Sequence, residues 1–271
     1  MKTRIITAAV AIPLLLVLLL AAPKIVTAVI WGLLMAIAAY ELLFRTGLVR
    51  EPRLVIYSMV MSFAVAMWSY FDAVHAYGVL GILVFTMLLF MEMMLSHVKV
   101  SFEKVSMCMV AGLLVPFLLC SLIRILIMTI GRFVVLIPFI VSFVSDSGAY
   151  FAGMYFGRHK LAPVISPKKT IEGAIGGVLA AMLGMLFYAL ILRMAFDFHV
   201  NFGYALIYGF LGSLTGIMGD LCFSVIKRQT GIKDYGNLLP GHGGVLDRFD
   251  SMMLVGPLME ALLVVIPMAV V

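Results

Sequence analysis

Nine apolar stretches, each roughly twenty residues long, recur along this chain and constrain its fold more than any other feature. A helix rises about 1.5 Å per residue, so about twenty apolar residues cross a hydrocarbon core about 30 Å thick. We therefore expect an all-α, polytopic integral membrane protein with about nine transmembrane helices. Their approximate spans are 5–22, 25–44, 54–71, 76–96, 105–127, 133–156, 172–195, 201–227 and 251–270.

Composition excludes a water-soluble globule, because 64% of the residues are hydrophobic and only 12% are charged. The net charge of +6 comes without interleaved aromatic and basic stretches, so nucleic acid is not an expected partner. Cys108, Cys120 and Cys222 lie in apolar stretches at unrelated spacings. They therefore suggest neither a disulfide framework nor a zinc site, and we interpret them as small packing residues.

The distribution of basic residues predicts the orientation in the membrane. If the nine helices alternate from a cytoplasmic N-terminus, fifteen of the nineteen Lys and Arg residues are cytoplasmic. Only Lys24, Arg124, Arg132 and Arg193 then fall outside. The positive-inside rule therefore predicts an N-in, C-out topology. A compact chain without an organelle-targeting segment further suggests a multi-pass protein of a bacterial inner (plasma) membrane, with its polar site facing the cytoplasm.

The first apolar run admits a second interpretation. Met1 to Arg4 is basic, and the uncharged run from Ile5 to Ala22 closes with small residues, as a secretory signal does. However, the run is long for a signal core, and another spanning segment follows almost at once. A retained first helix is the simpler interpretation.

Short connections favour one membrane domain over residues 1–271, whose two parts differ in kind. Residues 1–140 contain ordinary hydrophobic helices, which we interpret as scaffold and lipid contact. Residues 141–271 concentrate Gly, Asp, Lys and His in two cytoplasmic connections and the adjoining helix ends. Catalytic helices and loops are therefore expected in this C-terminal half. Glu260, in the last apolar stretch, either pairs with an interior partner or supports the site.

One face of the expected eighth helix is polar. Asp220, Ser224, Lys227 and Arg228 stand at positions i, i+4, i+7 and i+8. Asp220 lies about two turns inside the cytoplasmic end, and an ionisable group at that depth is a functional candidate. The alternative is a structural ion pair of Asp220 with Lys227 or with a neighbouring helix.

A glycine-rich turn follows this helix, from Gly231 to Gly244. Missing side chains permit close backbone approach to a ligand, and runs of backbone N–H groups bind phosphate. A plain flexible loop is the competing interpretation. We rank His242 as a phosphate contact rather than a metal ligand, since no second histidine lies at ligand spacing. The other candidate substrate-binding residues of this stretch are Lys233, Asp234, Gly243, Gly244 and Arg248.

Asp247 and Asp250 are three residues apart and share a face if they begin the ninth helix. Mg²⁺ takes oxygen ligands, often one or two carboxylates plus substrate phosphates. Several carboxylates with adjacent cations therefore suggest a Mg²⁺ site that also attracts phosphate. The alternative for Asp247 is helix N-capping with dipole stabilisation.

A second polar region spans residues 145–177. Asp146 lies deep in the sixth expected helix among hydroxyls and glycine, which could shelter its charge in a polar cavity. Ser166-Pro167-Lys168-Lys169 resembles a helix start, with serine as N-cap and proline at the first helical position. Lys168 and Lys169 there would attract an anionic headgroup or a triphosphate. Positive-inside anchoring is the competing explanation of these two lysines.

These residues resemble a known family. The pattern Ser224-x-x-Lys227-Arg228-x4-Lys233-Asp234-x4-Leu239-Pro240-Gly241-His242-Gly243-Gly244-x-x-Asp247-Arg248-Phe249-Asp250 is similar to the signature of the phosphatidate cytidylyltransferases, also called CDP-diacylglycerol synthases. No polar position departs from it. The Ser166 to Gly173 stretch and the Asp146 region are also similar, so the resemblance covers the C-terminal half strongly and the N-terminal half by hydropathy alone.

The resemblance implies a membrane enzyme that converts CTP and phosphatidic acid into CDP-diacylglycerol and pyrophosphate, with Mg²⁺ required. In that family the acids that match Asp220 and Asp247 are associated with a cytoplasmic metal centre. A second, monovalent ion such as K⁺ is a further candidate there. Similar enzymes are thought to be homodimers. We expect catalytic roles for Asp220, Asp247, Lys227, Arg228 and Asp250, and substrate-binding roles for Asp146, Lys168, Lys169 and Ser224.

Two other functions stay open at this point, besides a structural or assembly protein, which would leave the cluster of Asp, Lys and Gly residues unexplained. One is a related CTP-dependent enzyme acting on another lipid, such as a polyprenol kinase or an ether-lipid cytidylyltransferase. The other is an ion-coupled transporter, which would place broken helices in paired halves, whereas acids and glycines gather only in the second half. Binding of CTP separates the enzymes from the transporter, and competition between lipid substrates separates the enzymes.

Overall fold

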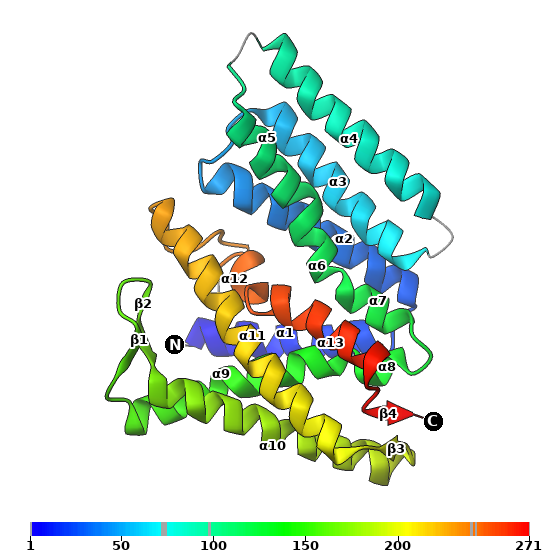
Figure 1. Cartoon of the computed structure of the whole chain (residues 1–271), viewed down its shortest axis with the longest axis vertical. Helices are drawn as coiled ribbons and strands as arrows, with labels where there is room; N and C mark the ends of the chain where they lie inside the picture. The colour runs from blue at the N-terminus through cyan, green and yellow to red at the C-terminus, as the bar shows by residue number, and fades with distance from the viewer. Residues whose placement is uncertain (1, 72–74, 97–98, 239–240, 242, 271) are drawn as a thin grey trace. The chain divides into compact units, whose positions relative to one another are not determined.

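The computed structural model describes residues 2–71, 75–96, 99–238, 241 and 243–270. It is built of helices with two small two-stranded sheets, so the expected all-α membrane fold is confirmed in its main feature (Figure 1). Among the described residues, seven helices are long and apolar enough to cross a membrane: Lys24–Arg45, Pro52–Tyr70, Tyr77–Leu95, Phe102–Ile127, Gly131–Phe156, Ile171–Phe196 and Phe202–Gln229. Ala9–Leu20 and Met252–Val265 are shorter apolar helices.

The chain forms two compact units. The first contains Met1–Ile127 and Lys227–Phe249, and the second contains Met128–Ile226 and Asp250–Val271. The helices of the first unit are α1 (Lys2–Leu20), α2 (Lys24–Tyr40) with its π-helical extension η1 (Glu41–Arg45), α3 (Pro52–Tyr70), α4 (His75–Leu95), α5 (Phe102–Met109), η3 (Val110–Leu114), α6 (Val115–Leu119), α7 (Ser121–Ile127) and α12 (Leu246–Phe249).

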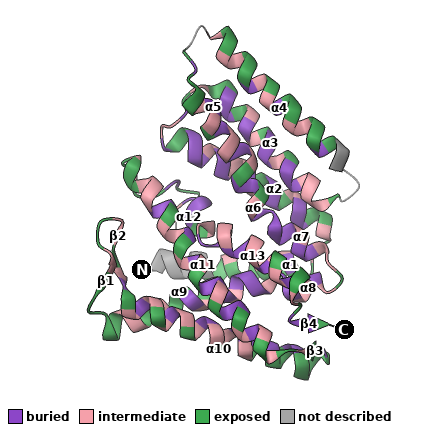
Figure 2. Ribbon diagram, in the orientation of Figure 1, coloured by how far each residue is buried: buried purple, intermediate pink, exposed green. Residues whose placement is uncertain are grey.

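The core of the first unit lies along α2 and α3, which carry many buried residues, whereas α4 is mostly exposed (Figure 2). Trp31 of α2 is almost fully buried, and its indole Nε1 donates to the Leu119 carbonyl at 3.2 Å. The same ring meets Phe249 of α12 edge to face, with 4.9 Å between centroids. These contacts attach residues 246–249 to the N-terminal helices.

The second unit contains three long helices: α9 (Leu136–Phe156), α10 (Ile171–Phe196) and α11 (Phe202–Gln229), whose last three residues belong to the first unit. Strands β1 (Lys160–Ala162) and β2 (Ser166–Thr170) form an antiparallel hairpin between α9 and α10. The remaining elements are α8 (Gly131–Val134), α13 (Met252–Val265) and the antiparallel pair β3 (His199–Val200) and β4 (Ala269–Val270).

Glycine on α10 allows α9 and α10 to pack closely. A Cβ added at Gly177 would lie 2.8 Å from the Ser145 carbonyl oxygen and 3.1 Å from the Ala149 Cβ. Small residues at such a contact let helix backbones approach, and lipid-immersed helices associate largely through this packing. The α9–α10 contact matters for the site because Ser145, Asp146 and the hairpin are all carried by these two helices.

We expect Gly177→Ala to destabilise the protein by about 1–3 kcal/mol, because the added methyl group collides with backbone that cannot rotate away. The measurement is the thermal unfolding midpoint in detergent micelles. Gly81→Ala is the matched control, since a Cβ at Gly81 meets nothing within 4 Å. Equal midpoints for the two variants would contradict the packing argument.

The structure corrects the expected end of the chain. The last long helix was expected over 251–270, but α13 runs from Met252 to Val265 and β4 follows at Ala269–Val270. Pro267 explains the stop, because the residue before a proline is biased away from helical backbone. Asp247 and Asp250 therefore do not begin one helix: Asp247 lies in α12, and Asp250 stands in the turn between α12 and α13.

Two smaller expectations are also corrected. Ser166-Pro167-Lys168-Lys169 does not start a helix but forms strand β2, and α10 begins at Ile171 with Thr170 as its N-cap. Cys108 and Cys120 are buried as expected of packing residues, whereas Cys222 is exposed on α11. The packing interpretation is therefore wrong for Cys222.

Candidate functional site

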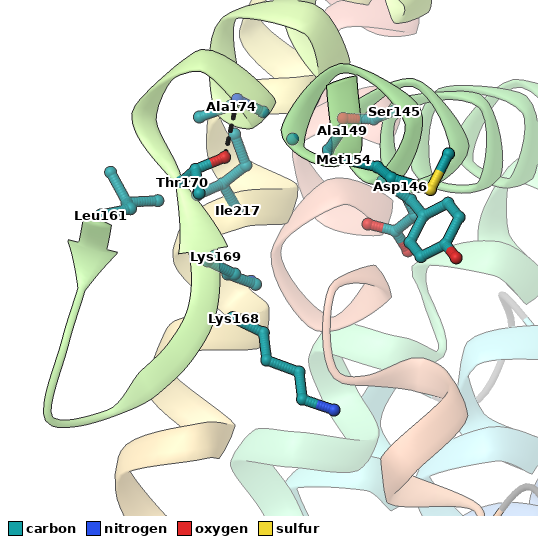
Figure 3. Close-up of a pocket in the computed structure, with 13 residues that line it drawn as sticks. Ser145, Asp146, Ala149, Met154, Leu161, Lys168, Lys169, Thr170, Ala174 and Ile217 are labelled. Atoms are coloured by element: carbon teal, nitrogen blue, oxygen red, sulfur yellow. Dashed lines mark hydrogen bonds between the residues drawn. The ribbon is translucent and has the colours of Figure 1, made fainter. Parts of the chain in front are cut away.

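A pocket of about 360 Å³ opens in the second unit between the β1–β2 hairpin and α9 (Figure 3). Lys168 and Lys169 enter it from the hairpin, while Asp146 lies on the α9 side. The pocket thus combines cations and a carboxylate with an apolar wall. It is lined by Ser145, Asp146, Ala149, Tyr150, Gly153, Met154, Leu161, Lys168, Lys169, Thr170, Gly173, Ala174 and Ile217.

Thr170 connects the hairpin to α10. Its hydroxyl oxygen accepts from the Gly173 N–H at 3.1 Å, which satisfies one of the unpaired donors at the start of the helix. The preceding residue, Lys169, is half-buried, and Lys168 is exposed. The register of the strand therefore places both lysines just before a helix N-terminus, although in a strand rather than in a helix.

Glu172 holds the other side of the hairpin. Its carboxylate accepts from the backbone N–H groups of Arg158 at 3.1 Å and His159 at 3.2 Å, and it contacts His159 Nδ1 at 2.6 Å. These bonds join the end of α9 to the beginning of α10. The hairpin that carries Lys168 and Lys169 is thereby closed at its base.

Glu172→Gln is expected to quicken backbone amide exchange in the β1–β2 hairpin several-fold, because loss of charge-assisted hydrogen bonds at its base loosens the lysine-bearing strand. The measurement is hydrogen–deuterium exchange of the peptide spanning residues 158–172 in the full-length protein in detergent. Glu103→Gln is the matched control, since Glu103 is also the second residue of its helix but is exposed and far along the chain from the hairpin. Wild-type exchange of this peptide in Glu172→Gln would contradict this role.

Asp220 of α11 pairs with the hairpin. Its Oδ2 forms a salt bridge with Lys169 Nζ, and its Oδ1 accepts from the Ser224 hydroxyl at 3.3 Å. The helical spacing of Asp220 and Ser224 is thus confirmed as a contact. The alternative of a structural ion pair for Asp220 is thus supported, although its partner Lys169 lies in strand β2 rather than in a neighbouring helix, and Lys227 binds Asp247 instead.

Among the acids of the first unit that we expect to belong to the site, Asp247 is the most buried. Its side chain is 2% exposed, and Oδ2 accepts from the backbone N–H groups of Tyr235 at 2.7 Å and Gly244 at 3.0 Å. Oδ1 pairs with Lys227 Nζ at 3.0 Å, and this ammonium also stands 5.5 Å from the Tyr235 ring centroid. Asp247 is therefore a fixed carboxylate within a hydrogen-bond network, not a simple helix cap.

Two carboxylates, those of Asp247 and Glu41, accept hydrogen bonds from the backbone at the end of the glycine turn. Gly243 has φ +85°, a conformation that favours glycine, and the next three backbone N–H groups donate to acids. Gly244 donates to Asp247, while Val245 and Leu246 each donate to Glu41 at 3.0 Å. Within the turn from Gly231 to Gly244, the N–H groups of Tyr235 and Gly244 are thus not open to phosphate, and phosphate binding by the rest of the turn stays a prediction. His242 lies outside the described residues.

Glu41, at the end of α2, is a residue that the sequence analysis missed. It is 3% exposed and lies in the half of the chain interpreted as scaffold. Its position at the edge of an apolar stretch could have indicated a role for this acid, because a buried charge in such a segment requires partners. No local motif indicated that those partners stand more than two hundred residues away.

The other predicted site residues occupy simpler positions. Arg228, Lys233, Asp234 and Arg248 are exposed. Asp250 belongs to the second unit, and its Oδ1 accepts from the Ser251 N–H at 2.8 Å. Its carbonyl oxygen packs against the α11 backbone, since a Cβ at Gly219 would approach it to 2.7 Å.

Asp220 and Asp247 have the chemistry that a Mg²⁺ ion requires. Both offer carboxylate oxygens, and each already pairs with a lysine ammonium. A carboxylate offers about four lone-pair sites, which leaves acceptor capacity beyond the contacts described. No group of three or more His, Cys, Asp or Glu side chains in the described part of the chain is placed to hold a metal ion. Mg²⁺ commonly uses only one or two carboxylates plus substrate phosphates.

Comparison with known proteins gives two consistent findings. The family model described as "Cytidylyltransferase family" matches residues 2–266. Proteins named phosphatidate cytidylyltransferase are similar to about half of the chain. The one from Staphylococcus epidermidis is 47% identical over 130 residues, covering 48% of each chain. Those from Staphylococcus haemolyticus and Staphylococcus aureus are each 46% identical over 137 residues, covering 49% of this chain and 50% of theirs. The matched stretch thus spans about half the length of these relatives.

Proposed function

The chain belongs to the cytidylyltransferase family, and we propose that it transfers the cytidylyl group of CTP to phosphatidic acid, giving CDP-diacylglycerol and pyrophosphate. The observation that supports this proposal most directly is the pocket of the second unit. Its apolar wall suits acyl chains, and Lys168 and Lys169 suit phosphate. A substrate with both properties is a phospholipid such as phosphatidate.

The reaction needs no protein nucleophile. A phosphate oxygen of phosphatidate attacks the α-phosphorus of CTP, the bond to the bridging oxygen of the β-phosphate breaks, and pyrophosphate leaves in line. A phosphate monoester is largely ionised at neutral pH, so a general base adds little. Positioning and charge neutralisation must supply most of the acceleration.

We assign a role in positioning or charge neutralisation to each residue from its contacts. We propose that Lys168, Lys169 and Arg228 bind phosphate oxygens and that Lys227 holds the Asp247 carboxylate in a fixed orientation. Asp220 and Asp247 are the proposed Mg²⁺ ligands, and K⁺ is a candidate for a second ion. Bound Mg²⁺ would neutralise the triphosphate and stabilise charge on the leaving group.

The membrane topology is part of the proposal. Nine helices in an N-in, C-out arrangement would place Lys168, Lys227 and Asp247 on the cytoplasmic side, where CTP is found. The seven long apolar helices support the polytopic part of this proposal, and the shorter helices Ala9–Leu20 and Met252–Val265 are the candidates for the remaining two spans. We further propose a bacterial inner membrane as the location and a homodimer as the assembly.

The test is conversion of radiolabelled CTP into a chloroform-soluble product by purified protein in mixed micelles. Product that requires both phosphatidate and Mg²⁺ supports the proposal. Binding of CTP without product from phosphatidate, but with product from a polyprenol or an ether lipid, would transfer the assignment to those substrates. A folded protein that binds no CTP would overturn a nucleotidyl transfer function.

A further inference from the structure

The first unit contains a buried acid to which the proposed reaction assigns no role. Glu41 lies in η1, directly after the apolar helix α2, and is 3% exposed. A charged group taken out of water is costly unless hydrogen bonds or ion pairs compensate it. Its partners therefore indicate what the residue is for.

Those partners are two consecutive backbone N–H groups. Glu41 Oε1 accepts from Val245 and Oε2 accepts from Leu246, both at 3.0 Å. Because both oxygens accept, the contact is bidentate and fixes the orientation of the peptide groups that it binds. The next residue in the chain is Asp247.

The glycines around this contact leave space for the Glu41 side chain. A Cβ at Gly236 or at Gly244 would collide with the Glu41 carboxylate. Gly244 also donates its N–H to Asp247 at 3.0 Å, so one backbone segment is shared by both acids. The N–H groups of three successive residues, 244–246, are thus divided between Asp247 and Glu41.

We propose that Glu41 is a positioning residue for Asp247. Its carboxylate fixes the segment from Gly243 to Leu246, and that segment sets the direction in which the Asp247 carboxylate points. This inference rests on the proposed function only for its kinetic consequence. The effect on the segment itself is independent of which reaction the protein catalyses.

Three variants weaken the hydrogen bonds of Glu41 to different extents. Glu41→Asp keeps the charge but is one methylene shorter, Glu41→Gln keeps the shape but replaces one acceptor by an NH₂ donor, and Glu41→Ala removes both acceptors. Glu92→Gln is the matched control, because Glu92 is another acid of the first unit, less buried than Glu41, and pairs with Tyr57 and Arg53 instead.

The first measurement is hydrogen–deuterium exchange of the peptide spanning residues 241–249 in the full-length protein in detergent. Exchange is expected to quicken by about 10-fold or more in Glu41→Gln and further in Glu41→Ala, while Glu92→Gln matches the wild type. Wild-type protection in both Glu41 variants would overturn the proposal.

The second measurement is the kinetics of CTP turnover on protein shown to be folded by its melting transition. Positioning predicts that kcat falls about 10-fold in Glu41→Gln, with partial recovery in Glu41→Asp and less than a 2-fold change in the KM for phosphatidate. Quickened exchange with an unchanged kcat would overturn the positioning role. If the wild type shows no CTP turnover, the proposed function fails, whereas the exchange measurement still decides whether Glu41 orders the segment.

Discussion

Replacing Asp247 by asparagine is expected to reduce kcat by at least about 100-fold, the largest effect that we predict for a single substitution. The carboxylate accepts from three donors, two of them backbone N–H groups and one the Lys227 ammonium. Asparagine keeps one acceptor oxygen but turns an NH₂ donor toward groups that are themselves donors. It also leaves Lys227, whose side chain is only 14% exposed, without its counter-charge.

The measurement is steady-state turnover of CTP at saturating phosphatidate, normalised to the folded fraction. Asp197→Asn is a suitable control, since it removes the same charge at a helix end in the left-handed conformation, which asparagine also tolerates. Turnover near the wild-type value in Asp247→Asn would remove Asp247 from the catalytic group.

Asp220→Asn is expected to reduce turnover by about 100-fold and to raise the Mg²⁺ concentration needed for half-maximal activity. Lys169→Gln is expected to reduce turnover less, by about 10-fold. The two side chains form one salt bridge and are each 27% exposed. Their effects should therefore be non-additive, with a coupling of about 1 kcal/mol in a double-mutant cycle.

Lys160→Gln provides the control for this cycle, because Lys160 is an exposed cation of the same hairpin. We expect no coupling between Lys160 and Asp220. Strictly additive effects of Asp220→Asn and Lys169→Gln would show that the salt bridge does not contribute to turnover. An unaltered Mg²⁺ requirement in Asp220→Asn would argue against its role as a metal ligand.

Hydropathy predicted the long helices well because apolar length is itself the physical requirement for crossing a bilayer. The expected stretch 54–71 is Pro52–Tyr70, and 172–195 is Ile171–Phe196. The ends that hydropathy placed wrongly are governed by local backbone chemistry instead. Pro267 lies beyond the end of α13, and Thr170 rather than Ser166 caps α10.

The site was predictable where its residues are close in sequence. The contact of Asp220 with Ser224 follows from helical spacing. The pairings of Lys169 with Asp220 and of Glu41 with Val245 do not, because they depend on how separate elements pack. Residue types alone also left the backbone N–H groups of the glycine turn available to phosphate, whereas the structure gives those of Tyr235 and Gly244 to the Asp247 carboxylate.

The bond between Glu41 and Val245 joins residues 204 positions apart, and this separation has a consequence for biosynthesis. The ribosome delivers Glu41 and its helix long before it delivers Val245 and Leu246. Until then the Glu41 carboxylate lacks the two donors that it has in the finished protein, and it must stay hydrated or protonated. The first unit can thus be completed only after almost the whole chain has been translated, and a chain that stops before residue 227 leaves this acid without its partners.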